Sequence, residues 1–211
     1  MTLLEYSLLA LSSLFVIVDP IAVTPAFLAM TAADTPEQRT RMARMACIVA
    51  GSLLLVFSVA GDLIFRFLGI TLPAFQLAGS IILLLIALDM LRAQRSRVQE
   101  TREETEAGSA KEDIAITPLA VPLLAGPGAI STVILLAGRA EDDWSKRIAL
   151  AACIVAIFII TYAILAVSSK GARWLSPIAL RITTRVMGLL LAAIAMQFLL
   201  NALRDVKLIS F

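Results

Sequence analysis

Two segments, half a chain apart, carry proline, alanine and a hydroxyl group in the same order. The first reads Asp19-Pro20-Ile21-Ala22-Val23-Thr24, and the second, 107 positions later, reads Gly126-Pro127-Gly128-Ala129-Ile130-Ser131. Asp and Gly favour the position before a helix and proline favours its first turn, so each segment is typical of a helix that stops and restarts. A helix start exposes N–H groups and partial positive charge. Each break therefore has the chemistry to bind an anion, such as the carboxylate of an amino acid.

Small and hydroxyl-bearing residues beside the breaks extend this chemistry. Thr24, Ser131 and Thr132 lie within about one turn of the breaks, and Gly128 would let a ligand approach the backbone closely. The alternative is that both breaks are packing kinks whose hydroxyls bond back to helix carbonyls. Because the break occurs in both halves, we favour a binding site. The predicted substrate-binding residues are Asp19, Pro20, Thr24, Pro25, Gly126, Pro127, Gly128, Ser131 and Thr132.

Asp19 is the one ionisable residue near the middle of an apolar run. A carboxylate at that depth is unfavourable by about 2.5 to 3.5 kcal/mol on insertion scales, which indicates a position facing the protein interior. It can meet a substrate ammonium, carry a coupling proton, or cap its half-helix, and the sequence leaves these three roles open. Gln76, Gln197 and Asn201 are weaker candidates, since contact between helices is the commoner role for such amides.

The elements that position these residues are membrane-length apolar runs. Hydrophobic residues make up 60% of the 211 residues and charged residues 16%, against about 25% charged in a soluble domain. A soluble helix would carry charges along its wet face, and these runs carry none. Each run is near the roughly 20 residues that cross a bilayer. With Asp19 set aside, the uncharged runs are 6–33, 45–61, 67–88, 114–138, 148–169 and 186–203. The sequence predicts an all-α polytopic membrane protein with six spans, of which the first and fourth are broken.

The six spans fall into two sets of three that resemble each other. Ala46-Cys47-Ile48-Val49-Ala50 recurs 106 positions later as Ala152-Cys153-Ile154-Val155-Ala156, and Gly79 matches Gly188. An odd number of spans in each copy turns the second copy upside down, which predicts a 3+3 inverted repeat. We expect residues 1–92 to form the first repeat, residues 93–113 a charged cytoplasmic linker, and residues 114–211 the second repeat.

The basic residues outside the spans indicate orientation. Of the 18 Lys and Arg, 12 lie in the connections 1–2, 3–4 and 5–6, and 6 lie on the other side. The positive-inside rule places the richer side in the cytoplasm and both termini outside it. No basic stripe remains for nucleic acid. Asp62 and Arg66, four positions apart near a span end, are expected to form an exposed ion pair.

Several kinds of chemistry lack the residues they need. The chain has no His, no two acids spaced to hold a metal inside the bilayer, and no nucleotide-phosphate loop. We therefore expect no catalytic residues, metal or cofactor, and no ATP-driven step by this chain. Cys47 and Cys153 are expected to be free packing residues. Because no span carries a strong Gly-xxx-Gly face, the sequence leaves homo-oligomerisation open.

The residues around both breaks also carry a resemblance to a known family. Two segments carry it: Asp19-Pro20 followed by Pro25 and Phe27, and the run Leu124-Ala125-Gly126-Pro127-Gly128-Ala129-Ile130. With these segments the sequence resembles the MarC family of six-span bacterial and archaeal membrane proteins, and the resemblance covers nearly the whole chain. That family includes proteins described as small neutral amino acid transporters. The resemblance implies an inner-membrane location and, through the wider LysE-type exporter superfamily, transport of small metabolites.

These observations together predict a secondary transporter of small neutral amino acids such as alanine or glycine, with export the expected direction. The predicted mechanism is alternating access of one repeat against the other around the paired breaks, with Asp19 as ammonium partner or proton carrier. The alternative, from another class, is a membrane binding or assembly module whose breaks only pack helices. A membrane enzyme ranks third, because the chain lacks His and has one central acid.

Overall fold

The first span is a helix broken at Asp19. In a computed structural model of the chain, α1 covers Leu3–Val18 and α2 covers Pro20–Met30. Asp19 lies between them in the left-handed region, with φ 43° and ψ 69°, and Pro20 begins α2, where a proline loses no helical hydrogen bond. The predicted break is therefore present. The structure describes residues 1–31, 34–92, 119–120, 123–140, 143–171 and 177–206, so the predicted linker 93–113 lies outside the described residues.

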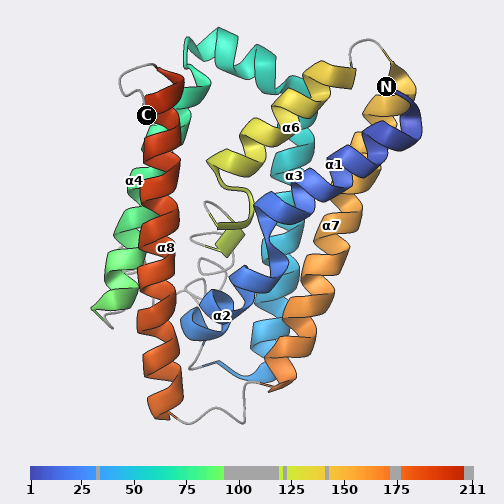
Figure 1. Cartoon of the computed structure of the whole chain (residues 1–211). Coiled ribbons are helices and arrows are strands. Elements are labelled where there is room, and N and C mark those ends of the chain that lie inside the picture. The colour runs from blue at the N-terminus through green and yellow to red at the C-terminus, as the bar shows by residue number, and fades with distance from the viewer. Residues whose placement is uncertain (32–33, 93–118, 121–122, 141–142, 172–176, 207–211) are drawn as a thin grey trace.

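The next two spans are continuous helices. α3 covers Pro36–Leu68 and α4 covers Leu72–Leu91. A capping box between Thr35 and Gln38 starts α3 well before the predicted span 45–61, because the charged turns ahead of the apolar run are also helical. The helix ends at Gly69, whose φ of 64° suits a residue without Cβ. Figure 1 shows the last part of α3 turning across one end of the bundle.

The second half restarts its first helix at Pro127. The described residues 119–120 and 123–124 are π-helical, and the Ala125 N–H donates to the Ala120 carbonyl at 2.8 Å. α6 then covers Pro127–Ala140, α7 covers Trp144–Gly171 and α8 covers Pro177–Asp205. The 14 residues of α6 rise about 21 Å, less than the roughly 30 Å of a bilayer core. The second predicted break is thus also a real helix start.

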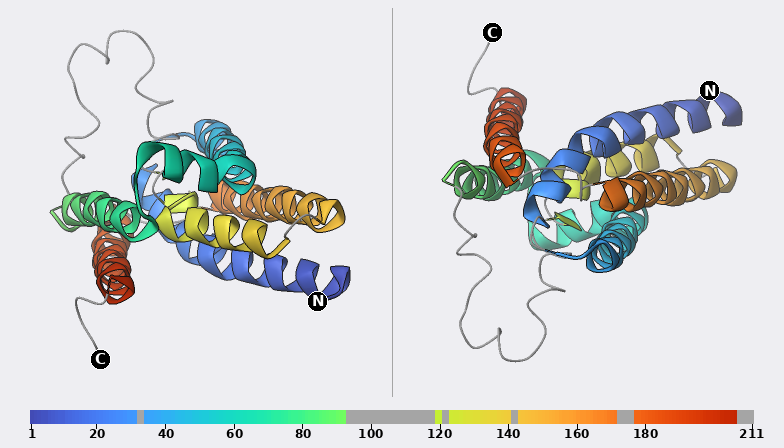
Figure 2. Two further views of the ribbon diagram at one scale, coloured as in Figure 1. Left: turned by 90° about the horizontal axis from the view of Figure 1, so that it is seen from above. Right: turned by 90° about the horizontal axis from the view of Figure 1, so that it is seen from below.

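Helices of the two halves pack in matched pairs, as Figures 1 and 2 show from three sides. α3 packs against α7, and α4 packs against α8. In addition, α2 packs against α7 and α8, while α6 packs against α3 and α4. If the two halves are exchanged, α3·α7 and α4·α8 map onto themselves, and the two contacts of α2 map onto the two contacts of α6, as a two-fold axis requires. The inverted repeat stays a prediction, and this packing favours it.

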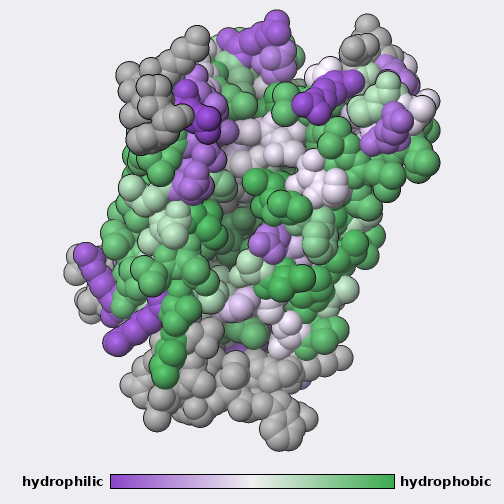
Figure 3. Space-filling model, in the orientation of Figure 1, coloured by the Kyte–Doolittle hydropathy of each residue, from purple (hydrophilic) through white to green (hydrophobic). Residues whose placement is uncertain are grey.

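The outer surface is suited to lipid. Within the described residues, five candidate spans are long and apolar enough to cross a membrane, counting α1 and α2 as one, and α6 is a shorter apolar helix. Figure 3 shows hydrophobic residues over most of the middle of one face, with hydrophilic residues gathered mainly towards its ends. α1 begins and α8 ends at the same end of the molecule (Figure 1). The prediction of an all-α polytopic membrane protein is confirmed.

Candidate functional site

The two helix breaks lie beside each other. A Cβ atom built on Gly128, one residue after Pro127, would lie 3.0 Å from Cδ1 of Ile17, which is two residues before Asp19. It would also lie 3.2 Å from Cζ of Phe198 in α8. The Ile17 side chain at the end of α1 therefore packs against the backbone at the start of α6, and the Phe198 side chain of α8 packs against the same point. Segments more than 100 positions apart in sequence meet here.

Asp19 serves the first break as a cap at both helix ends. Its backbone N–H donates to the Phe15 carbonyl at 3.0 Å, which closes α1, and its Oδ1 accepts from the Ala22 N–H at 3.1 Å, which starts α2. Among the described residues it is the one non-glycine residue with positive φ. Asp tolerates this conformation better than most residues. Its side chain is exposed on the protein surface rather than enclosed by it.

The three hydroxyls predicted to bind substrate are each hydrogen-bonded within their own helix. Thr24 donates to the Pro20 carbonyl at 2.9 Å, Ser131 to Pro127 at 2.6 Å and Thr132 to Gly128 at 2.8 Å. Each hydroxyl has one hydrogen, so its donor is committed, while its oxygen keeps lone pairs. In this conformation they can accept from an ammonium group but cannot donate to a carboxylate.

Gln76 of α4, a weaker candidate by sequence than the break residues, reaches the second break. Its Nε2 donates to Ser131 Oγ at 3.0 Å, and its Oε1 is buried without a hydrogen-bond partner. Next to it, Gly79 approaches α6 so closely that a Cβ there would overlap the Pro127 ring. α4 is thereby pressed against the start of α6. The signal in the sequence was the single amide side chain in the run 67–88.

Three aromatic rings pack together beside this part of α4. Phe57 and Phe65 of α3 and Phe75 of α4 have ring centroids 5.3 to 6.4 Å apart, in tilted arrangements. Such pairs stabilise by about 0.5 to 1.5 kcal/mol beyond their buried area. Because Phe75 directly precedes Gln76 in the chain, this cluster fixes the first turns of α4 relative to α3.

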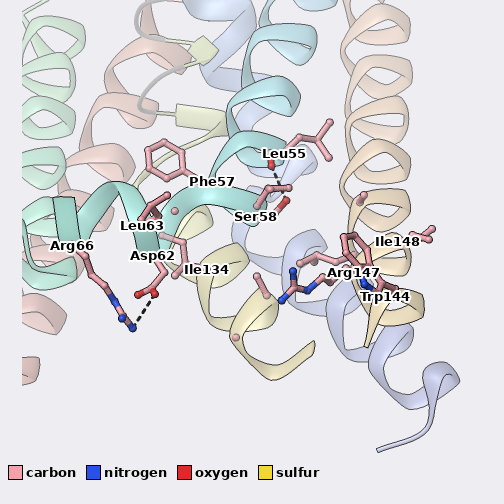
Figure 4. Close-up of a pocket in the computed structure, with 16 residues that line it drawn as sticks. Leu55, Phe57, Ser58, Asp62, Leu63, Arg66, Ile134, Trp144, Arg147 and Ile148 are labelled. Atoms are coloured by element: carbon pink, nitrogen blue, oxygen red, sulfur yellow. Dashed lines mark hydrogen bonds and ion pairs between the residues drawn. The ribbon is translucent and has the colours of Figure 1, made fainter. Parts of the chain in front are cut away.

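A cavity of about 690 Å³ lies elsewhere, where the ends of α3 and α6 meet the start of α7. Figure 4 shows Asp62 and Arg66 on one side of it and Trp144 and Arg147 on the other. Asp62 and Arg66 form the predicted exposed ion pair, at 2.9 Å, and the Arg147 guanidinium lies 5.6 Å from the Trp144 ring centroid. None of the predicted substrate-binding residues lines this cavity. It is distinct from the paired breaks.

The matched cysteines are buried and free. Cys47 of α3 and Cys153 of α7 belong to the same apolar core, which also holds Leu54 and Ile157. Their predicted role as free packing residues is confirmed.

Comparisons with known proteins agree with this architecture. Residues 4–207 match the family described as MarC family integral membrane protein. The UPF0056 membrane protein MJ1677 of Methanocaldococcus jannaschii is 38% identical over 97% of this chain and 99% of its own length. The UPF0056 membrane protein of Aquifex aeolicus is 35% identical, over 93% of this chain and 91% of its own. The UPF0056 membrane protein YvbG of Bacillus subtilis is 37% identical over 87% of each. No solved structure matches the chain.

Proposed function

The chain belongs to the MarC family of integral membrane proteins, and from this premise we propose that it is a secondary transporter of small neutral amino acids such as alanine or glycine. We propose that it lies in the inner membrane of the cell and that it exports these amino acids from the cytoplasm. The observation that carries the proposal is the contact between the two breaks, through Ile17 and Gly128. In transporters built from internal repeats, broken helices that meet inside the bilayer form the substrate site.

The two breaks differ in charge, and this difference would orient an amino acid, which carries both a carboxylate and an ammonium group. The Asp19 carboxylate accepts from the Ala22 N–H in the first turn of α2, whereas α6 starts after Gly126, which has no side chain to cap it. A substrate carboxylate therefore suits the start of α6, where helix N–H groups and partial positive charge favour an anion. The ammonium group suits Asp19 and the lone pairs of the Thr24 and Ser131 hydroxyls.

The mechanism that follows is alternating access around the paired breaks. The side chains of Ile17 and Phe198 pack against Gly128, so their separation would widen access to the start of α6. Relative movement of the two repeats would open this contact toward one side of the membrane and then the other. Asp19 would accompany the substrate as ammonium partner or as carrier of a coupling proton.

The direct test is flux into proteoliposomes that contain this chain alone. A panel of radiolabelled amino acids, with glycine and L-alanine first, is added outside, with and without a pH gradient. We expect saturable uptake of one or both, competed by the unlabelled amino acid. Uptake no faster than in protein-free vesicles for every amino acid would refute the proposal. Dependence on the pH gradient would indicate proton coupling.

A second candidate is a membrane binding or assembly module, and one observation favours it. The hydroxyls of Thr24, Ser131 and Thr132 all donate within their own helices, as they would if the breaks served packing alone. Such a module would give no flux in the same vesicles. The flux assay therefore separates the two candidates.

A further inference from the structure

One buried polar atom at the second break has no partner. Among the described residues, Oε1 of Gln76 is the one buried side-chain nitrogen or oxygen without a hydrogen bond. A buried acceptor left unpaired is unfavourable, and folded proteins leave few of them. The atom therefore requires an explanation beyond helix packing.

The surrounding hydrogen bonds decide which end of the Gln76 amide is left unpaired. Ser131 Oγ donates its only hydrogen to the Pro127 carbonyl, at 2.6 Å. It can therefore only accept from Gln76, and the amide must turn Nε2 toward it, as seen at 3.0 Å. The unpaired end is therefore the oxygen. What it lacks is a hydrogen-bond donor.

The position of Gln76 connects this missing donor with transport. Gly79, one turn further along α4, touches the Pro127 ring, so Gln76 lies against the start of α6. This is the point where we place the substrate carboxylate, and in an amino acid the ammonium group is bonded to the neighbouring carbon. A carboxylate at α6 thus brings N–H donors to the surroundings of Gln76.

We propose that Oε1 of Gln76 accepts a hydrogen bond from the ammonium group of the transported amino acid, and so selects for amines. This inference rests on the proposed function and adds a residue to it. In the closed conformation the oxygen is buried and unpaired. It becomes paired when the repeats move apart and substrate enters, so the empty closed state is disfavoured relative to the loaded one.

The test compares three variants in proteoliposomes, with L-alanine and glycine as substrates. Gln76→Met removes both amide atoms at similar size. Ser131→Ala removes the partner of Nε2 but leaves Oε1. Gln197→Met is the matched control, because Gln197 is an exposed glutamine in α8 whose amide donates to Asn201. Inhibition by propionate, which is alanine without its amine, reports binding of the carboxylate alone.

We expect Gln76→Met to raise the KM for L-alanine about tenfold or more, the usual effect of losing a hydrogen bond to a charged group. Inhibition by propionate should stay unchanged, Ser131→Ala should raise KM less, and Gln197→Met should match the wild type. The melting temperature of substrate-free Gln76→Met should fall less than that of Ser131→Ala. Gln76→Met removes the unpaired oxygen together with the bond to Ser131, whereas Ser131→Ala leaves both amide atoms of Gln76 unpaired.

Other results would overturn the inference. Wild-type discrimination between alanine and propionate in Gln76→Met would mean that Gln76 only joins α4 to α6, while the transport proposal would stand. A melting temperature lowered equally by Gln76→Met and Ser131→Ala, with KM unchanged, would point the same way. Absence of alanine and glycine flux in the wild type would remove the proposed function, and this inference with it.

Discussion

At the scale of single residues, Asp19 combines two unusual features. Its backbone is in the left-handed region, and its carboxylate lies within a membrane-length apolar segment. Its Oδ1 caps α2 through the Ala22 N–H, which explains why a residue with a short oxygen-bearing side chain stands there. The capping does not explain the charge, because Asn or Ser caps a helix about as well. The charge is therefore the part of Asp19 for which a functional role is needed.

Asp19→Asn separates these roles. Asn tolerates the left-handed region and keeps an oxygen for the Ala22 N–H, but loses the charge and the transferable proton. We expect amino acid flux to fall at least as much as in any other single polar substitution, with an unchanged melting temperature. The measurement is flux normalised to reconstituted protein, beside thermal unfolding in detergent. Wild-type flux would leave Asp19 as a cap only.

The hydroxyls at the breaks should contribute less than Asp19. Thr24→Val and Ser131→Ala each remove one acceptor for the substrate ammonium, worth about 1 kcal/mol, or about fivefold in the apparent substrate constant. The maximal rate should change little, because each hydroxyl hydrogen only bonds back to its own helix. Kinetics over a range of alanine concentrations distinguish the two parameters. A large loss of maximal rate with unchanged KM would contradict a role in binding.

At the scale of elements, the close contact between α4 and α6 depends on Gly79, which has no side chain. A Cβ at Gly79 would overlap Pro127, and one at Gly188 would lie 2.9 Å from the Leu91 backbone nitrogen. α4 is thus held near α6 on one side and near α8 on the other. Neither contact tolerates a methyl group without movement of a helix.

Gly79→Ala should destabilise the protein by about 1 to 3 kcal/mol, the usual effect of overpacking, and should impair flux. The matched control is Gly138→Ala near the end of α6, where an added Cβ would meet nothing within 4 Å. There we expect stabilisation of about 0.5 to 1 kcal/mol from better helix propensity. Thermal unfolding of both variants in the same detergent checks the pair. Equal stability of the two would show that α4 and α6 are not packed as described.

The breaks could be predicted from the residues beside them, whereas the residues that pack around them could not, because those are far away in the sequence. Proline after Asp19 and Gly126 marks a helix start whatever lies around it, and α2 and α6 begin there. The bond between Gln76 and Ser131 spans 55 positions, so only the packed fold brings the two together. The cavity between α3, α6 and α7 depends in the same way on how helices cross.

At the scale of the whole molecule, the ends of the described chain indicate an even number of crossings, since α1 begins and α8 ends at one end of the bundle (Figure 1). In the sequence, 12 of the 18 basic residues belong to the connections 1–2, 3–4 and 5–6. The described helices beside these connections meet the opposite end of the bundle, where α3 and α8 begin and α4 and α7 end (Figure 1). The positive-inside rule then predicts that this opposite end faces the cytoplasm.

A reporter fused to the C-terminus tests this orientation. We expect a periplasmically active enzyme to be active there, and a reporter that works only in the cytoplasm to be silent. Fusion of the same reporters after Arg92, at the end of α4, should give the reverse pattern and serves as the control. Cytoplasmic activity at the C-terminus would invert the topology and place the linker outside.

The pairing of α3 with α7 and of α4 with α8 also has a consequence for how the protein is made. During synthesis α3 and α4 enter the bilayer long before α7 and α8 leave the ribosome. Until then the surface of α4 around Ala87 and Leu91, which packs against Gly188 of α8 in the finished protein, lacks that partner. The first half must therefore wait in the bilayer without these partners, and native packing of α4 can be completed only after α8 has been synthesised.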